Sequence, residues 1–349
     1  MMNNFKIFVD ILKNIFLKYD IVYIVETADW SIKWDGFYLS SNLKKNRIKS
    51  RTASSSKYIK NSIIHFGSVN TFINENGIKK VDKSNKIILT WFHITENDKR
   101  IKFIPELNNK VDLIHTSCQK TKELLIKYGL KAEKIVVISL GVDLNVFKKY
   151  TEEKREEIKK KLNLPINKII IGSFQKDGQG WGEGLKPKLE KGPDIFCEVV
   201  EKISKQKNIH ILLTGPARGY VKTRLEKAKI SYTHYYLKNY LEIVNYYNCL
   251  DLYLVTSRAE GGPKAILESM ATGVPFVTSD VGLVSDILEN DKNTFICSNT
   301  EELFNKSIYL LNSKEKQEEF IKNNLKEIKK YSWQKIAEKY FDRIYNNFL

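Results

Sequence analysis

Residues 255–282 read VTSRAEGGPKAILESMATGVPFVTSDVG and carry the strongest structural signal in the chain. An apolar run gives way to a polar loop, and Gly261-Gly262-Pro263 then opens a helix that ends near Gly273. Proline favours the first helical position, and a glycine before it can act as the N-cap. The segment therefore predicts a strand, a glycine-rich turn and a helix, with a second strand after the helix.

The start of this predicted helix has the features of an anion-binding site. First-turn N–H groups have no partner within a helix, and the helix dipole places partial positive charge there. Lys264 adds a full charge in the same turn, so a diphosphate would suit the site. Glu260 precedes the helix and Glu268 lies within it. Because carboxylates beside phosphates are costly, we expect them to accept hydrogen bonds from sugar and ribose hydroxyls, although a solvated helix start explains either glutamate alone.

The rest of the chain alternates short apolar runs with helical segments. The runs predict strands at residues 21–25, 63–66, 87–90, 113–116, 135–138, 169–172, 209–214, 252–256 and 276–278. Strands that are apolar at nearly every position are typical of parallel sheets covered on both faces. We therefore expect an α/β protein with two Rossmann-like, doubly wound domains. The expected bounds are residues 1–147, residues 148–330 and a C-terminal helix over residues 331–349.

The composition is that of a folded protein with a strong positive charge. The chain has 349 residues, 42% of them hydrophobic, and a formal net charge of +17. Four scattered cysteines form no CxxC pair, which argues against a zinc ribbon and a disulfide scaffold. No apolar run has the length of a membrane span, and charges interrupt the first 20 residues, so we expect neither a span nor a signal peptide.

Residues 1–20 instead predict an amphipathic helix. The apolar residues that share one face of it are Phe5, Phe8, Leu12, Ile15 and Phe16.

The densest group of positive charges follows in the first domain. It consists of Lys44, Lys45, Arg47, Lys49 and Arg51. Such a group can bind an anionic membrane or a nucleic acid, and a general richness in lysine explains it equally well.

Several common enzyme motifs are absent from the sequence. There is no GxxxxGK[ST] phosphate loop, no GxGxxG fingerprint, no HExxH and no GxSxG. Asp-x-Asp does not occur either, so we expect no metal site of that kind. These absences exclude most nucleotide and hydrolytic enzymes of the α/β class.

The E-x7-E pattern of Glu260 and Glu268, followed by SMATGVPFV, resembles the nucleotide-sugar signature of retaining family-four glycosyltransferases. Further matches follow the family's order: ISLGVDLNVF at 138–147, IGS at 171–173 with KG at 191–192, LTGP at 213–216 and SW…Y within 331–345. The resemblance covers about residues 85–349. It implies the two-domain GT-B fold, with domains facing a central cleft and a C-terminal helix crossing back to the first domain.

The resemblance also implies roles for individual residues. Glu260 would hold the donor sugar's hydroxyls, Lys191 would offset charge on the leaving diphosphate, and His93 would face the donor sugar, although a strand-end histidine is as often structural. Glu268 would hold the ribose. The other donor-binding residues expected are Gly261, Gly262, Lys264, Ser173, Lys176, Gly215, Pro216, Tyr235 and Tyr236.

The sequence departs from the family in two places. Ser173 stands where the family usually has an arginine, and we expect Lys176 to substitute for it across a long loop, residues 175–190, that contains Trp181.

Near the N-terminus, ADWSIKWDG at 28–36 replaces the usual glycine pair. We expect Asp35 and Gly36 to form that loop, with Trp30 and Trp34 near the acceptor.

Together these features predict a retaining, hexosyltransferase-type glycosyltransferase. It would move a sugar from a nucleotide-diphospho-sugar to a glycan or lipid-linked acceptor in cell-surface polysaccharide or glycoconjugate synthesis. We expect no cofactor, no essential metal and no nucleic-acid partner, and a cytoplasmic protein in peripheral contact with the inner face of the membrane. The alternatives are a non-enzymatic basic protein that binds membranes or nucleic acid, and a sugar-nucleotide epimerase or phosphorylase on a similar scaffold.

Overall fold

The computed structural model describes residues 2–26, 31–45, 47–74 and 77–349. The chain divides into two compact units. The first contains Met1–Gly141 together with Tyr331–Leu349, and the second contains Val142–Lys330. Within the described residues, no helix combines the length and the apolar composition that a membrane crossing requires.

The first unit is built on a six-stranded parallel sheet of order β2-β1-β3-β6-β7-β8. Its strands are β1 Ile21–Ile24, β2 Ser50–Ala53, β3 Ile63–Phe66, β6 Lys86–Thr90, β7 Leu113–Thr116 and β8 Ile135–Val137. A short antiparallel pair, β4 Ile73–Asn74 and β5 Gly77–Ile78, lies apart from this sheet. The inner strands β1 and β3 are buried at every position, as expected for a sheet covered on both faces.

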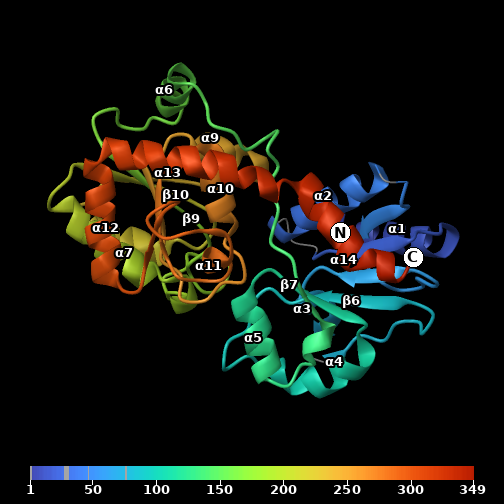
Figure 1. The fold of residues 1–349 in the computed structure, drawn as a ribbon. Helices are drawn as coiled ribbons and strands as arrows, with labels where there is room; N and C mark the ends of the chain where they lie inside the picture. Colours follow the sequence, from blue (N-terminus) through green and yellow to red (C-terminus); the bar gives the residue numbers. More distant parts are fainter. Residues whose placement is uncertain (1, 27–30, 46, 75–76) are drawn as a thin grey trace. The chain divides into compact units, whose positions relative to one another are not determined.

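The helices of the first unit include one from the far end of the chain. They are α1 Met2–Phe16, α2 Ser31–Lys45, α3 Val69–Phe72, α4 Ile104–Lys110, α5 Gln119–Lys127 and α14 Trp333–Arg343. Helix α14 packs beside α2 (Figure 1), and the Tyr38 and Trp333 rings stack with centroids 5.6 Å apart. The expectation that the C-terminal helix crosses back to the first domain is therefore confirmed.

The second unit repeats the architecture, with the parallel order β11-β10-β9-β12-β13-β14. Its strands are β9 Ile169–Phe174, β10 Ile209–Thr214, β11 Tyr232–Tyr235, β12 Leu252–Val255, β13 Phe276–Ser279 and β14 Phe295–Cys297. Its helices are α6 Glu152–Lys161, α7 Pro193–Ser204, α8 Gly219–Lys227, α9 Ile243–Tyr247, α10 Lys264–Thr272, α11 Val284–Ile287, α12 Thr300–Asn312 and α13 Lys314–Glu327. Two parallel, doubly wound sheets confirm the predicted fold class.

The basic cluster of the sequence is not a single surface. Arg51 lies in β2 with its side chain buried, and its Nη1 is 2.9 Å from Asp10 Oδ1 in α1. Lys44, Arg47 and Lys49 remain exposed. The interpretation of Arg51 as part of a surface patch was therefore wrong, because the side chain instead holds α1 against the sheet.

Two buried histidines connect the sheet of the first unit to its C-terminal segment. His65 Nδ1 lies 2.6 Å from the Tyr345 hydroxyl, and His65 Nε2 lies 2.7 Å from the Thr90 hydroxyl. His115 Nε2 lies 2.9 Å from the Tyr340 hydroxyl and 2.9 Å from the Ile138 carbonyl oxygen. Burial lowers the pKa of His115 to about 4 and holds the pKa of His65 well below its ordinary value. Both rings are therefore neutral in the folded protein at neutral pH.

We expect acid to destabilise the first unit through these histidines. Their pKa values are lowered on folding, so the unfolded chain takes up protons at a higher pH than the folded one. The free energy of unfolding should then be highest above about pH 6.5 and fall toward pH 4, by about 1.4 kcal/mol per pH unit for each histidine. Urea unfolding between pH 7 and pH 5 measures the slope. A His115→Gln variant should lose part of it, and an unchanged slope would contradict the assignment.

Candidate active site

The candidate site of the second unit lies where the strand order reverses. Chain order runs outward from β9 to β10 and β11, and then returns to β12 on the other side of β9. In open α/β sheets, ligands bind outside the carboxyl ends of strands at such a point. The segments that carry Lys191 and Glu260 follow β9 and β12, the two strands that flank the reversal.

The start of α10 differs in detail from the expectation. Pro263 is the N-cap residue, with φ −67° and ψ 104°, and the helix begins at Lys264. Gly262 was expected at the N-cap, and this expectation was wrong because Pro263 has extended, non-helical backbone. Gly261 is buried beneath the loop after β13, where a Cβ on Gly282 would come within 2.7 Å of the Gly261 carbonyl oxygen. This close backbone approach fixes the loop ahead of the helix.

A glycine also explains how Lys191 reaches this loop. Gly192 has φ 62°, and a Cβ there would lie 1.8 Å from the Thr256 carbonyl oxygen. The Thr256 hydroxyl donates to the Gly192 carbonyl oxygen at 2.9 Å. Because only glycine permits this contact, the Lys191-Gly192 pair is held against the end of β12.

The structure brings two of the residues predicted as catalytic into direct contact. Lys191 Nζ lies 2.5 Å from Glu260 Oε1, and the Ser257 hydroxyl donates to the same oxygen at 3.1 Å. The side chains are 21% and 13% exposed, so the pair is shielded and still open to a ligand. In such a pair the cation can bind a phosphate group while the carboxylate accepts a hydrogen bond from a hydroxyl.

Glu268 lies deeper, on α10, and is 4% exposed. Its Oε1 accepts a short hydrogen bond from the Tyr240 hydroxyl, and Lys264 Nζ lies 5.8 Å from the centroid of the Tyr240 ring. Burial, and then the charge of Glu268, raises the pKa of the Tyr247 hydroxyl well above its ordinary value. Tyr240 thus connects the two charged residues of α10. Sequence reasoning missed it, because a tyrosine at the start of a short helical segment gives no periodic signal.

Ser173 stands where the family that the sequence resembles usually has an arginine. Here a buried arginine from another part of the sequence, Arg218, lies beside Ser173. Arg218 donates to the Ser173 carbonyl and hydroxyl oxygens at 2.7 and 2.9 Å, and its Nη2 lies 3.0 Å from Asp177 Oδ2. Both side chains of this ion pair are fully buried. Lys176, expected to replace the missing arginine, has its Nζ 4.0 Å from the centroid of the Trp181 ring.

The long loop after β9 is folded as a hairpin. An isolated bridge joins Gly178 to Pro187, and the Gln179 N–H donates to the Lys186 carbonyl at 2.8 Å. The N–H groups of Gly219 and Tyr220 donate to the carbonyls of residues 183 and 184, at 2.7 and 3.0 Å. The hairpin therefore occupies the first amides of α8.

The remaining expected donor residues lie on or after β10 and β11, not on the segments that follow β9 and β12. Gly215, with φ 90°, and Pro216 follow β10, and a Cβ on Gly215 would lie 3.0 Å from the Gln175 carbonyl oxygen. Tyr235 lies on the edge strand β11, where its hydroxyl donates to the Leu162 carbonyl at 2.9 Å. Tyr236 is exposed. Two strands, β10 and β9, separate β11 from β12.

The site residues expected in the first unit lie after β6 and inside α2. His93 is exposed and follows β6, with its carbonyl accepting from the Trp91 indole N–H at 3.1 Å. Asp35 and Gly36 lie inside α2, next to Trp34, so their placement in a loop was wrong. A Cβ on Gly36 would come within 2.6 Å of the Tyr23 ring, which shows that this glycine allows the helix to pack closely on β1. Trp30 lies outside the described residues.

Comparison with solved structures defines the class of fold. The structure of Anabaena Alr3699/HepE in complex with UDP-glucose matches with a TM-score of 0.76 at 14% identity, covering 94% of this chain and 100% of that one. WaaG, a glycosyltransferase involved in lipopolysaccharide biosynthesis, matches with a TM-score of 0.65 at 12% identity, covering 93% and 99%. The protein therefore has the GT-B glycosyltransferase fold.

Sequence comparison finds a family model over part of the chain. Residues 187–327, less than half of the chain, match the family of glycosyl transferases group 1. The lipopolysaccharide core biosynthesis mannosyltransferase LpsB of Rhizobium meliloti is 28% identical over 160 residues, 44% of this chain and 42% of that protein. The N,N'-diacetylbacillosaminyl-diphospho-undecaprenol alpha-1,3-N-acetylgalactosaminyltransferase of Campylobacter jejuni is 27% identical over 237 residues, 66% and 60% of the two chains. The chain spans about two fifths of the length of LpsB.

Proposed function

We propose that the protein is a retaining glycosyltransferase that uses a nucleoside-diphosphate sugar as donor. The observation that carries the proposal is the contact between Lys191 and Glu260 beside the start of α10, at the reversal of strand order. A cation there can meet the negative charge of a leaving diphosphate, and a carboxylate there can accept a hydrogen bond from a sugar hydroxyl. The group 1 family match covers both residues.

The proposed chemistry assigns a separate part of the donor to each residue. Lys191 and the N-terminal amides of α10 offset the negative charge that grows on the diphosphate as the glycosidic bond breaks. Glu260 accepts hydrogen bonds from the donor sugar, and Glu268, oriented by Tyr240, accepts them from the ribose. When a donor binds, its phosphate competes with Glu260 for Lys191. In the absence of donor the ion pair keeps both charges satisfied.

The acceptor that we propose is a glycan or a lipid-linked sugar in cell-surface polysaccharide or glycoconjugate synthesis. The relatives named above, which act in lipopolysaccharide biosynthesis or on a diphospho-undecaprenol-linked sugar, support this class. We place the reaction in the cytoplasm, at the inner face of the membrane, and propose that it needs no cofactor. We also propose that it needs no essential metal, because the sequence has no Asp-x-Asp pair. NMR of the product's anomeric centre tests retention, and activity that EDTA abolishes would overturn the metal-free proposal.

Nucleotide binding tests the donor site directly. We expect one of UDP, GDP, ADP and dTDP, at about 100 times its dissociation constant, to add roughly 2.7 kcal/mol to the free energy of unfolding. The Glu268→Ala variant should bind that nucleotide about tenfold or more weakly, because a carboxylate hydrogen bond is lost. Thermal shift measures both effects.

The matched control is Glu157→Ala, which removes an exposed carboxylate in the middle of α6. It should bind the nucleotide as the unaltered protein does. A melting curve that no nucleotide moves would rule out the proposed donor site.

A further inference from the structure

Helix α1 is attached to the first unit by its polar residues. Asp10 Oδ1 lies 2.9 Å from Arg51 Nη1, and Asp10 Oδ2 accepts from the Ser54 N–H at 2.7 Å. Asn14 donates to the carbonyl oxygens of residues 55 and 57, at 3.1 and 2.9 Å. The side chains of Asp10 and Arg51 are each 9% exposed. The buried side chains that the structure describes in this helix are therefore polar and contact β2 and the loop after it, whereas the inward side of a surface helix is usually apolar.

The apolar side chains that share the other face of α1 are exposed. Phe5 is 71% and Phe16 is 77% exposed, and the remaining large apolar residues exposed on α1 and just after it are Phe8, Leu12, Ile15 and Leu17. Soluble proteins rarely leave so many large apolar groups together in water, and such a face marks a surface that binds another phase or partner. The apolar face that the sequence predicts for this amphipathic helix thus lies on the outside.

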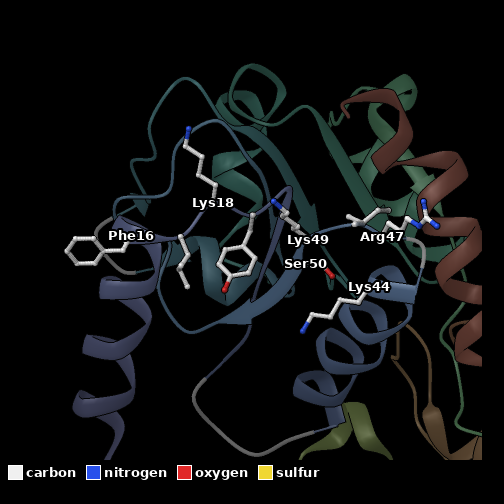
Figure 2. Close-up of a pocket in the computed structure, with 9 residues that line it drawn as sticks. Phe16, Lys18, Lys44, Arg47, Lys49 and Ser50 are labelled. Carbon is white, nitrogen blue, oxygen red and sulfur yellow. The ribbon is translucent and has the colours of Figure 1, made fainter.

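A hollow of about 570 Å³ adjoins the C-terminal end of this face. Phe16 and Leu17 line one part of it, and its other side chains include the cations Lys18, Lys44, Arg47 and Lys49 (Figure 2). None of the nine described residues that line the hollow is acidic. The nearby Asp20 carboxylate accepts from the Lys49 N–H at 2.8 Å. Four cations around one hollow suit a phosphate group.

We propose that α1 lies in the surface of an anionic membrane and that the hollow takes up the phosphate of a lipid headgroup. An outward apolar face beside lysines and an arginine is the pattern of a helix that lies in a membrane interface. A nucleic acid would use the cations and leave the six apolar groups in water, so a lipid surface matches both halves of the site. The inference extends the proposed function, because a lipid-linked acceptor lies in such a surface.

Binding to vesicles tests both halves of this surface. The protein should sediment with phosphatidylcholine vesicles that contain phosphatidylglycerol, and far less with pure phosphatidylcholine. The triple variant Lys44→Gln, Arg47→Gln, Lys49→Gln should bind anionic vesicles about a hundredfold more weakly, about fivefold for each charge. The double variant Phe8→Ser, Phe16→Ser should lose at least about tenfold for each ring.

The matched control removes three exposed lysines of the same unit that do not line the hollow. Lys80→Gln, Lys83→Gln, Lys131→Gln changes the net charge equally and should keep nearly all vesicle binding. If both triple variants lost vesicle binding equally, net charge alone would explain the binding, and the proposed headgroup site would be wrong. Stronger binding to a DNA oligonucleotide through the same three cations, or a dimer that Phe8→Ser abolishes without any vesicle binding, would also overturn it.

The test is separate from that of the donor site. The vesicle-binding variants should keep the nucleotide-dependent thermal shift, and Glu268→Ala should keep vesicle binding. Loss of the thermal shift alone would count against the transferase, and loss of vesicle binding alone against the membrane surface.

Discussion

Replacing Arg218 with methionine is expected to lower the free energy of unfolding of the second unit by about 3–5 kcal/mol. The variant leaves the fully buried Asp177 carboxylate without its cation and removes donors from the carbonyls of Ser173, Thr214 and Gln175. Burial raises the pKa of Asp177 even with Arg218 beside it, so the carboxylate is costly in this place. Urea unfolding, with hydrogen exchange at the amides of α8, measures the loss.

Two further variants separate this buried pair from an ordinary ion pair. Arg224 lies in α8, the helix that Arg218 precedes as its N-cap, and pairs with Glu201 at 2.8 Å, but these side chains are 34% and 27% exposed. Arg224→Met should therefore cost no more than about 1 kcal/mol. Adding Asp177→Leu to Arg218→Met should restore part of the stability, because no buried charge remains. Equal costs for Arg218→Met and Arg224→Met would contradict the argument.

The strands that the sequence predicted are those with an uninterrupted apolar run. The runs at residues 63–66, 113–116 and 209–214 coincide with β3, β7 and β10, which lie inside their sheets and are buried on both faces. The three strands it missed in the two main sheets, β2, β11 and β14, are all edge strands. An edge strand pairs on one side only and needs less apolar sequence, as SRTA in β2 and YTHY in β11 illustrate.

Contacts between polar residues far apart in the chain were harder to predict than the strands. Lys191 and Glu260 were both singled out through a motif, and the structure brings them together. Arg218 and Asp177 belong to no periodic pattern, and the sequence pointed to Lys176 only because it is near Ser173. Arg51 was grouped with surface lysines for the same reason. Whether a charge is buried depends on a partner that sequence spacing does not reveal.

Replacing Lys191 with methionine is expected to reduce turnover of the donor by about 10²–10³-fold. The variant keeps the length and packing of the side chain and removes the charge that meets the leaving diphosphate in the proposed reaction. It also leaves Glu260 without the cation 2.5 Å away. Release of the nucleoside diphosphate from its sugar donor measures the effect without an identified acceptor, because water can take the sugar. Melting of the variant, followed in parallel, separates lost chemistry from lost folding.

Lys188→Met is the matched control for this variant. Lys188 lies three residues earlier in the same segment, and its Nζ is 3.6 Å from Glu190 in a half-exposed pair. Its removal should change turnover by no more than a few fold, since the proposed reaction gives this charge no contact with the diphosphate. Lys191→Arg should keep part of the activity, because the guanidinium remains charged while its fork differs from a point charge. Equal turnover in Lys191→Met and Lys188→Met would show that Lys191 does not stabilise the leaving group.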